Sequence, residues 1–245
     1  LVEGPPLPAD QFSFVGMAAI PMRHGLTIGE MTNYLNASLK VGADVRVVEV
    51  EDWKRNEGWP AARAWTAPSP NLPRIEGVRT YPGMVMLEGT NLSEGRGTTT
   101  PFEVVGAPFL EPRAYVRELE RFELPGVTVR PTKFRPTFDK HAGEACGGAA
   151  FHVTDPGRFR PYRTTVAAMA AAWRLAPATC AWRPPPYEYE YVKPPIDILA
   201  GPALRPAIES GRLVCAADLD SLCDPDFKRW RREAVDFLLY GELSE

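Results

Sequence analysis

The chain has 245 residues, enough for one large domain or two small ones, and its 44% hydrophobic and 24% charged residues are typical of a globular protein. A net charge of −3 and the lack of any apolar run near the roughly 20 residues of a membrane helix argue against nucleic acid or a membrane as partner. The four cysteines form no C-x-x-C pair and the three histidines lie far apart, so we expect no metal and infer no disulfide.

A helix is predicted after residue 27. Thr27 and Glu30 form a T-x-x-E capping box, in which each side chain satisfies a free backbone amide at the start of a helix. Apolar residues then recur at helical spacing until Gly42 ends the pattern: Ile28, Met31, Leu35 and Leu39. Valines at 45, 47 and 50 predict a strand next, so this region is expected to close an α/β layer.

Residues 52–82 carry many prolines and show no sustained period, so we interpret them as a long connection between two subdomains. The aromatic and branched residues between the prolines favour an ordered connection. Trp53, Trp59 and Trp65 could stack on a sugar ring or anchor the connection to the core, and the second use is the commoner one.

The apolar run at residues 84–87 predicts a buried strand that leads into a polar, glycine-rich loop over residues 88–102. This loop combines carboxylates, a guanidinium, an amide and hydroxyls with glycines that let backbone amides approach a ligand. Open α/β folds build their sites in loops that follow buried strands, so we expect a site here, with a solvated turn as the alternative.

Strands and helices alternate beyond this loop. We predict strands over residues 103–109, around residues 127–129 and over residues 149–153. Pro112 fits the first turn of a helix whose apolar positions are Tyr115, Leu119 and Phe122. Further helices are predicted over residues 164–175 and after Asp224-Pro225, the last with an apolar face made of Phe227, Trp230, Ala234 and Phe237.

The loop at residues 88–102 contains candidates for catalytic carboxylates and for an anion-binding arginine. Glu88 and Glu94 lie six positions apart, and glycoside hydrolysis uses two carboxyls, one of them kept protonated, but spacing in a loop cannot establish such a pair. Arg96 between Gly95 and Gly97 suits binding of a carboxylate or a phosphate. The string lacks the lysine and the spacing of a nucleotide-binding P-loop.

Two other polar segments are candidates for ligand binding. Arg23 and His24 precede a helix start, where free amides favour anions, and a surface turn is an equal alternative. Lys140 and His141 stand in a second glycine-containing patch before an expected strand, where a bulged hairpin is the simpler interpretation.

Several strings taken together are recognisable. They are Val-Glu-Gly-Pro at residues 2–5, Pro-Met-Arg-His-Gly-Leu-Thr at 21–27, Pro-Ser-Pro-Asn-Leu-Pro at 68–73, the loop at 87–102, Lys-His-Ala-Gly at 140–143 and Cys-Gly-Gly at 146–148. They resemble, in the same order, the motifs of the NamZ-type exo-β-N-acetylmuramidases, a bacterial family long catalogued as a domain of unknown function. Because the strings are long and span nearly the whole chain, the chain is identified as a member of this family.

The resemblance implies a glycosidase that removes N-acetylmuramic acid from the non-reducing end of peptidoglycan fragments, with muramyl saccharides as ligands and no cofactor. It also implies a Rossmann-like domain, a smaller α+β domain and a site between them. We therefore expect an α/β fold: residues 1–60 as the C-terminal part of the Rossmann-like domain, 61–82 as a Pro/Trp-rich connection and 83–245 as an α+β C-terminal domain. Family members are usually exported, so an exported or periplasmic location is expected.

The resemblance assigns roles to individual residues. Glu3 is the first candidate for a catalytic carboxylate, followed by Glu94 and Glu88. Muramic acid carries a lactyl carboxylate, so we expect a cation to bind it. Arg96 is the first candidate for this role and Arg23 the second. The other expected substrate contacts are Asn91, Thr98, Thr99, His24, Lys140 and His141.

The family pattern also includes a long segment before the Val-Glu-Gly-Pro string, with a Gly-Pro-Glu-His-Gly motif whose glutamate is a favoured catalytic candidate. No string of this sequence matches that motif. Three interpretations stay open: a fragment of a longer protein, a missing N-terminal half supplied by a partner polypeptide, or lost activity. The alternative functions are a non-catalytic module that binds muramyl saccharides and, more distantly, a phosphate- or nucleotide-binding enzyme that uses the Gly-Arg-Gly turn.

Overall fold

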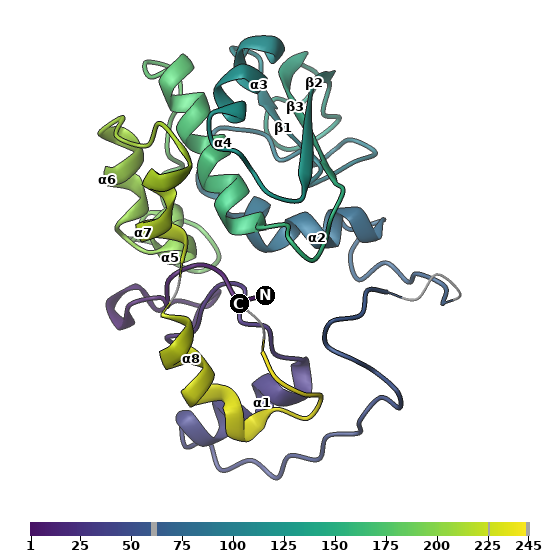
Figure 1. The fold of residues 1–245 in the computed structure, drawn as a ribbon. Helices are drawn as coiled ribbons and strands as arrows, with labels where there is room; N and C mark the ends of the chain where they lie inside the picture. The colour runs from purple at the N-terminus through teal and green to yellow at the C-terminus, as the bar shows by residue number, and fades with distance from the viewer. Residues whose placement is uncertain (60–62, 225, 244–245) are drawn as a thin grey trace.

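The structure is a computed structural model that describes residues 1–59, 63–224 and 226–243. After a short 3-10 helix, η1 (Ala9–Gln11), its helices and one small antiparallel sheet form two unequal parts (Figure 1). The sheet and the helices around it enclose the larger hydrophobic core, and a smaller core lies at the bottom of the view. The fold is therefore mixed α/β, with an antiparallel sheet.

The smaller core includes the first long helix, α1 (Ile28–Ser38). Its predicted capping box is present, because the Thr27 hydroxyl accepts a hydrogen bond from the Glu30 amide (3.3 Å) and the Glu30 carboxylate accepts one from the Thr27 amide (2.7 Å). The prediction of the buried face is confirmed in part, because Met31 and Leu35 pack against the smaller core and Ile28 and Leu39 do not. Tyr34 is buried against Trp230, with ring centroids 5.2 Å apart, whereas Ile28 is 89% exposed. An aromatic contact with a distant helix therefore sets this face.

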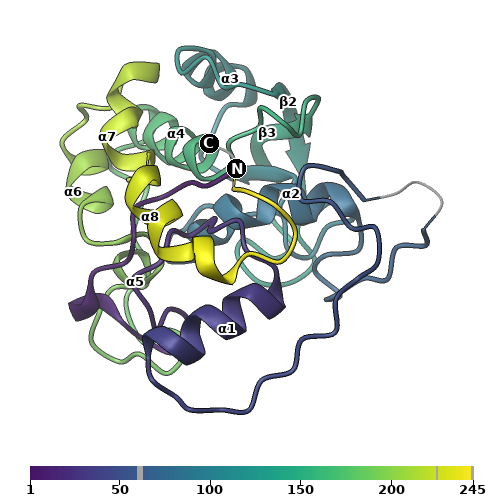
Figure 2. The same ribbon diagram turned by 60° about the horizontal axis from the view of Figure 1, so that its bottom comes forward.

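The other wall of the smaller core is α8 (Phe227–Ala234), which runs beside α1 and continues into η4 (Val235–Phe237) (Figure 2). Its cap is Asp226, whose carboxylate accepts a hydrogen bond from the Arg229 amide (3.0 Å). The helix thus begins later than the Asp224-Pro225 start that we predicted, and Pro225 lies outside the described residues. The predicted apolar face is confirmed, since it packs into the smaller core: Phe227, Trp230, Ala234 and Phe237.

Residues 41–59 run along the outside of the molecule (Figure 2). The strand predicted over residues 45–50 is absent: these residues have no regular secondary structure, and Val48 is 92% exposed. A strand needs a neighbour that bonds its backbone groups, and the described part of the chain places no strand beside this segment. Trp53 packs edge-to-face on Tyr240, with centroids 4.8 Å apart, so it anchors the connection to the C-terminal segment.

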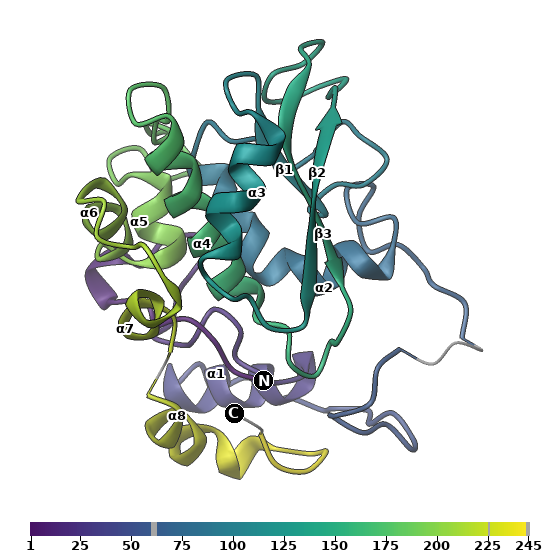
Figure 3. The same cartoon turned by 45° about the horizontal axis from the view of Figure 1, so that its top comes forward.

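The three strands of the sheet are the predicted ones: β1 (Val104–Ala107), β2 (Val127–Phe134) and β3 (Cys146–Val153), in the order β1-β3-β2 (Figure 3). Both pairs are antiparallel, with Val105 opposite Ala149 and Val129 opposite Phe151. A Cβ at Gly148 would overlap the Val105 carbonyl. The Cys-Gly-Gly string therefore serves close packing of the central strand.

The predicted helix α3 (Pro112–Glu120) packs on β2 and β3, and the predicted helix α4 (Pro161–Leu175) lies beside α3 (Figure 3). The Glu111 carboxylate caps α3 by accepting hydrogen bonds from the backbone amides of Arg113 and Ala114. Pro112 occupies the first turn as predicted. Tyr115 is buried and donates a hydrogen bond to the Ala168 carbonyl (2.9 Å). This bond ties α3 to α4.

The run at residues 84–87 is buried but helical, so the strand predicted there is wrong. It belongs to α2 (Ile75–Met84) and to the 3-10 helix η2 (Val85–Gly89) that continues it. The Val85 amide bonds the Tyr81 and Gly83 carbonyls within this helix. A short, wholly apolar run has no period that separates a strand from a buried helix, and packing against α4 decides for the helix.

Four short elements after residue 194 were not predicted. They are α5 (Pro195–Ala200), α6 (Leu204–Glu209), η3 (Ala216–Leu219) and α7 (Asp220–Cys223), and they pack against α4 and η2. Each is too short for a hydrophobic period to be visible in the sequence. Across the described ranges, no helix combines the length and the apolarity needed to span a bilayer.

Candidate functional site

The glycine-rich loop, the turn at residues 139–140 and a segment near residue 187 enclose one polar pocket of about 260 Å³. Acidic and basic side chains make up most of its wall. The lining residues are Glu88, Glu94, Arg96, Asp139, Lys140, Arg183, Pro186, Tyr187 and Glu188. The structure thus brings both loop glutamates, Arg96 and Lys140 together, as a site would require.

Glu94 is the most buried charged residue of this pocket, with 0% exposure. Its carboxylate forms ion pairs with Arg96 Nε at 3.0 Å and with Lys140 Nζ at 2.6 Å. Beyond these two cations, neither oxygen has a hydrogen-bond donor among the described residues. A carboxylate has about four acceptor sites, so Glu94 keeps some of them for hydrogen bonds from a ligand.

The backbone places Glu94 through two glycines in left-handed conformations, Gly95 (φ +82°) and Gly97 (φ +78°). The Ser93 hydroxyl accepts a hydrogen bond from the Gly95 amide (3.1 Å), and the Phe102 amide donates to the Glu94 carbonyl (2.6 Å). Side chains with a Cβ rarely adopt these φ values. The glycines therefore fix the turn from which Glu94 and Arg96 project.

Lys140 holds the loop from the opposite side. Its ammonium group donates hydrogen bonds to the carbonyls of Leu87 (2.8 Å) and Leu92 (2.6 Å), and it also lies 3.4 Å from the Thr90 carbonyl. With Glu94, these contacts use all three of its N–H donors. Lys140 therefore acts as a clamp on the loop and has no donor left for a substrate.

Arg96 is shared between the two loop glutamates. Its Nη2 atom forms an ion pair with Glu88, its Nε atom pairs with Glu94, and its guanidinium lies 5.1 Å from the centre of the Phe102 ring. Burial lowers the pKa of Arg96, but the charges of Glu88 and Glu94 outweigh it, so the net shift is upward. Arg96 is a permanent cation that two carboxylates already neutralise.

Tyr187 completes the network. Its hydroxyl donates a hydrogen bond to Glu88 Oε2 at 2.6 Å. Burial is the main cause that raises the pKa of Tyr187, and the hydrogen bond to Glu88 raises it further, so the hydroxyl keeps its proton and remains a donor. Ion pairs with Arg96 and Lys140 and the Tyr187 hydroxyl thus hold the two loop glutamates, an arrangement that suits a nucleophile or a charge-stabilising group.

Other expected contacts support the loop or line a different surface. The Asn91 amide clamps the backbone at residues 179–181, donating to the Thr179 carbonyl (2.8 Å) and accepting from the Ala181 amide (2.9 Å). His141 Nε2 lies 2.7 Å from the Asn91 carbonyl. Thr98 and Thr99 face a separate, open groove of about 760 Å³ beside β2. None of these four residues lines the polar pocket.

Glu3 lies in a second buried charge cluster at the start of α4 and is not among the pocket residues. It is 2% exposed, pairs with Arg23 Nη1 at 3.1 Å and accepts a hydrogen bond from the Arg163 amide (3.3 Å). Burial raises the pKa of Glu3, although the charge of Arg23 opposes the shift. The neighbouring His24 accepts a hydrogen bond from the Leu26 amide (3.0 Å), and burial lowers the pKa of its imidazole.

Sequence reasoning missed the pocket residues that lie far along the chain from the loop. Arg183, Tyr187 and Glu188 flank the cis Pro185-Pro186 bond, and Asp139 precedes Lys140. The only signal was the proline cluster followed by alternating aromatic and acidic residues at 187–191. Across the described residues, no group of three or more histidines, cysteines or acidic side chains could hold a metal ion.

The chain was compared with known families and proteins. Residues 79–240 match the family described as exo-β-N-acetylmuramidase NamZ, C-terminal, and residues 1–76 match the corresponding N-terminal family. The chain is 39% identical over 216 residues to the peptidoglycan β-N-acetylmuramidase NamZ of Bacillus subtilis (strain 168). That match covers 87% of this chain and 50% of the relative, so the chain spans about half the length of the curated relative.

Two crystal structures of DUF1343 family proteins from Bacteroides fragilis NCTC 9343 share the fold. The first has a TM-score of 0.83 at 23% identity, covering 98% of this chain and 63% of the other. The second has a TM-score of 0.69 at 22% identity, covering 99% of this chain and 63% of the other.

Proposed function

The chain belongs to the NamZ family of exo-β-N-acetylmuramidases, and from this premise we propose that it forms part of a glycoside hydrolase that releases N-acetylmuramic acid from the non-reducing end of peptidoglycan fragments. The polar pocket is its muramyl-binding site. The observation that carries this proposal is Glu94, whose buried oxygens line the pocket between two cations and have no other hydrogen-bond donor among the described residues. Hydroxyl and acetamido groups of a sugar supply such donors.

Glu3 and the loop glutamates have different roles in this proposal. A general acid must carry a proton near neutral pH, and the raised pKa of Glu3 is the direction that this role requires. Glu94 and Glu88, held as carboxylates by Arg96, stabilise positive charge that develops on the sugar ring. No metal or organic cofactor takes part.

The finer architecture is also proposed. Residues 1–60 form the C-terminal part of a Rossmann-like domain and residues 83–245 belong to the C-terminal domain. The connection expected over residues 61–82 ends earlier, because α2 begins at Ile75 and packs against α4 of the C-terminal domain. The two family matches meet between residues 76 and 79, which supports a division near the connection.

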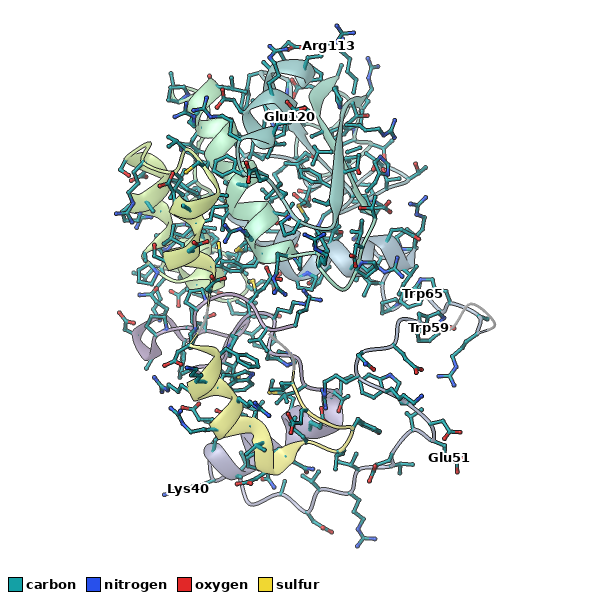
Figure 4. All side chains as sticks on the ribbon, in the orientation of Figure 1. Lys40, Glu51, Trp59, Trp65, Arg113 and Glu120 are labelled. Carbon is teal, nitrogen blue, oxygen red and sulfur yellow. The ribbon has the colours of Figure 1, made fainter. Side chains whose placement is uncertain are left out.

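Release of the aglycone from a chromogenic β-N-acetylmuramide tests the hydrolase. Glu3→Gln should lower the rate by about 10²- to 10⁴-fold, because it removes the general acid. Glu94→Gln should lower the rate by about 10²- to 10³-fold, because it removes a charge that stabilises the transition state. Glu120→Gln is the matched control, because Glu120 is exposed on α3 at the top of Figure 4. Full activity in both site variants would contradict the assignment.

A second candidate function is a non-catalytic module that binds muramyl saccharides. One observation favours it: the pocket's two buried or half-buried glutamates are both paired with Arg96, and Glu3 does not line the pocket. Calorimetric binding of a muramyl disaccharide without any release of muramic acid would support this function. Measurable turnover that Glu94→Gln abolishes would exclude it.

A further inference from the structure

Arg183 differs from the other cations of the polar pocket because it has no acidic partner. Its side chain makes no ion pair or hydrogen bond with any described residue, and its guanidinium lies over the Tyr187 ring at 5.6 Å. By contrast, Glu88 and Glu94 occupy Arg96, and the Leu87 and Leu92 carbonyls together with Glu94 occupy the N–H donors of Lys140. Arg183 alone can bind a new carboxylate without breaking an existing ion pair.

The backbone and a neighbouring ring place Arg183 at the rim of the pocket. The Arg183 backbone amide donates a hydrogen bond to the carbonyl of Gly89 (2.8 Å). Because Gly89 follows Glu88 in the chain, this bond holds the Arg183 backbone close to Glu88. Tyr187 is buried, and its hydroxyl bonds Glu88 while its ring faces the guanidinium. A planar guanidinium that rests on a fixed aromatic ring keeps its N–H edge free for a carboxylate.

The pocket needs such a cation for an acidic ligand. Four acidic side chains and three basic ones line it, and Asp139 and Glu188 have no ion-pair partner among the described residues. These two exposed acids face the same pocket and repel an anion. A carboxylated sugar is therefore favoured over a neutral one only where a free guanidinium meets its carboxylate.

We propose that Arg183 binds the lactyl carboxylate of the muramyl group and selects it over neutral N-acetyl sugars, with Tyr187 as its positioning residue. Arg96 then positions Glu88 and Glu94 and does not contact the lactyl group. This inference rests on the proposed function, because it takes the muramyl sugar as the ligand. The role of lactyl-binding cation, which the family resemblance assigned to Arg96, thus passes to Arg183.

The test compares N-acetylmuramic acid with its methyl ester, which lacks the charge, by calorimetric titration of this chain. The wild type should bind the acid more tightly than the ester, and Arg183→Met should remove about tenfold of affinity for the acid while leaving the ester unchanged. Arg183→Lys should restore part of the preference. Arg113→Met, on an exposed arginine of α3 labelled in Figure 4, is the matched control and should keep it.

Two variants of Tyr187 test its role as the positioning residue of Arg183 in the same titration. Tyr187→Phe keeps the ring and should keep the preference for the acid, whereas Tyr187→Leu removes the ring and should reduce the preference without changing affinity for the ester. Equal losses for acid and ester would show a structural role and overturn the positioning assignment.

The outcomes separate this inference from the proposed function. A wild type that binds both sugars without preference, or an Arg183→Met variant that keeps the preference, would overturn the role of Arg183 and leave the muramyl site standing. A wild type that binds neither sugar would overturn both.

Discussion

Replacing Lys140 by methionine is the sharpest test of how the site is held together. The substitution keeps the length of the side chain but removes an ammonium group that bonds the Leu87 and Leu92 carbonyls and pairs with Glu94. Glu94 would keep one cation, Arg96, and the Leu92 carbonyl would lose its donor, whereas the Leu87 carbonyl would keep the amide and the hydroxyl of Thr90. The loop that carries both glutamates depends on these contacts.

The size of the effect follows from the burial of the pair. Removing one partner of a buried ion pair costs about 3–5 kcal/mol. The Lys140 side chain is 16% exposed and Arg96 remains beside Glu94, so the lower end of this range applies, and we expect a loss of about 3 kcal/mol in the free energy of unfolding.

Urea unfolding followed by tryptophan fluorescence measures this loss. Lys133→Met, on an exposed lysine of β2, should change the free energy of unfolding by less than about 0.5 kcal/mol. The double variant with Glu94→Gln should be more stable than Lys140→Met alone, because the neutral amide removes the uncompensated charge. A Lys140→Met variant as stable as the Lys133→Met control would refute the clamp.

Two further predictions concern Glu3 and Gly83. The pKa of Glu3 is raised above its ordinary 4.5 in the folded state, so its stabilisation is present at low pH and is lost as the pH rises through the folded-state pKa. In urea titrations the wild type should therefore lose stability relative to Glu3→Gln as the pH rises above 4.5, and parallel pH profiles would contradict this. Gly83→Ala should lower the free energy of unfolding by about 1–3 kcal/mol, because the added Cβ would overlap the Pro161 carbonyl. This cost outweighs the better helix propensity of alanine. The control Gly58→Ala places its Cβ in open space and should leave the free energy of unfolding nearly unchanged.

Local signals in the sequence were enough to predict several elements. Thr27 with Glu30, and Pro112 after Glu111, mark helix starts because their side chains or ring satisfy local backbone requirements. Alternating valines around residues 127–129 marked β2, where β3 supplies a partner. The same alternation at residues 45–50 gave no strand, because no neighbouring strand lies beside that segment in the described part of the chain.

The site could be predicted only in part. The loop at residues 88–102 was identifiable because Glu88, Glu94 and Arg96 are close in sequence. Tyr187 and Arg183 come from a segment about ninety residues away, and only tertiary packing brings them to Glu88. Burial decides that Lys140 is a clamp, and no sequence pattern reports burial for a single lysine.

The most direct test of the central claim is a calorimetric titration of this chain and its Glu94→Gln variant with a peptidoglycan fragment that ends in N-acetylmuramic acid. The muramyl site in the polar pocket predicts binding by the wild type and at least about tenfold weaker binding by the variant. Equal affinity in the two proteins, or no binding by either, would contradict it.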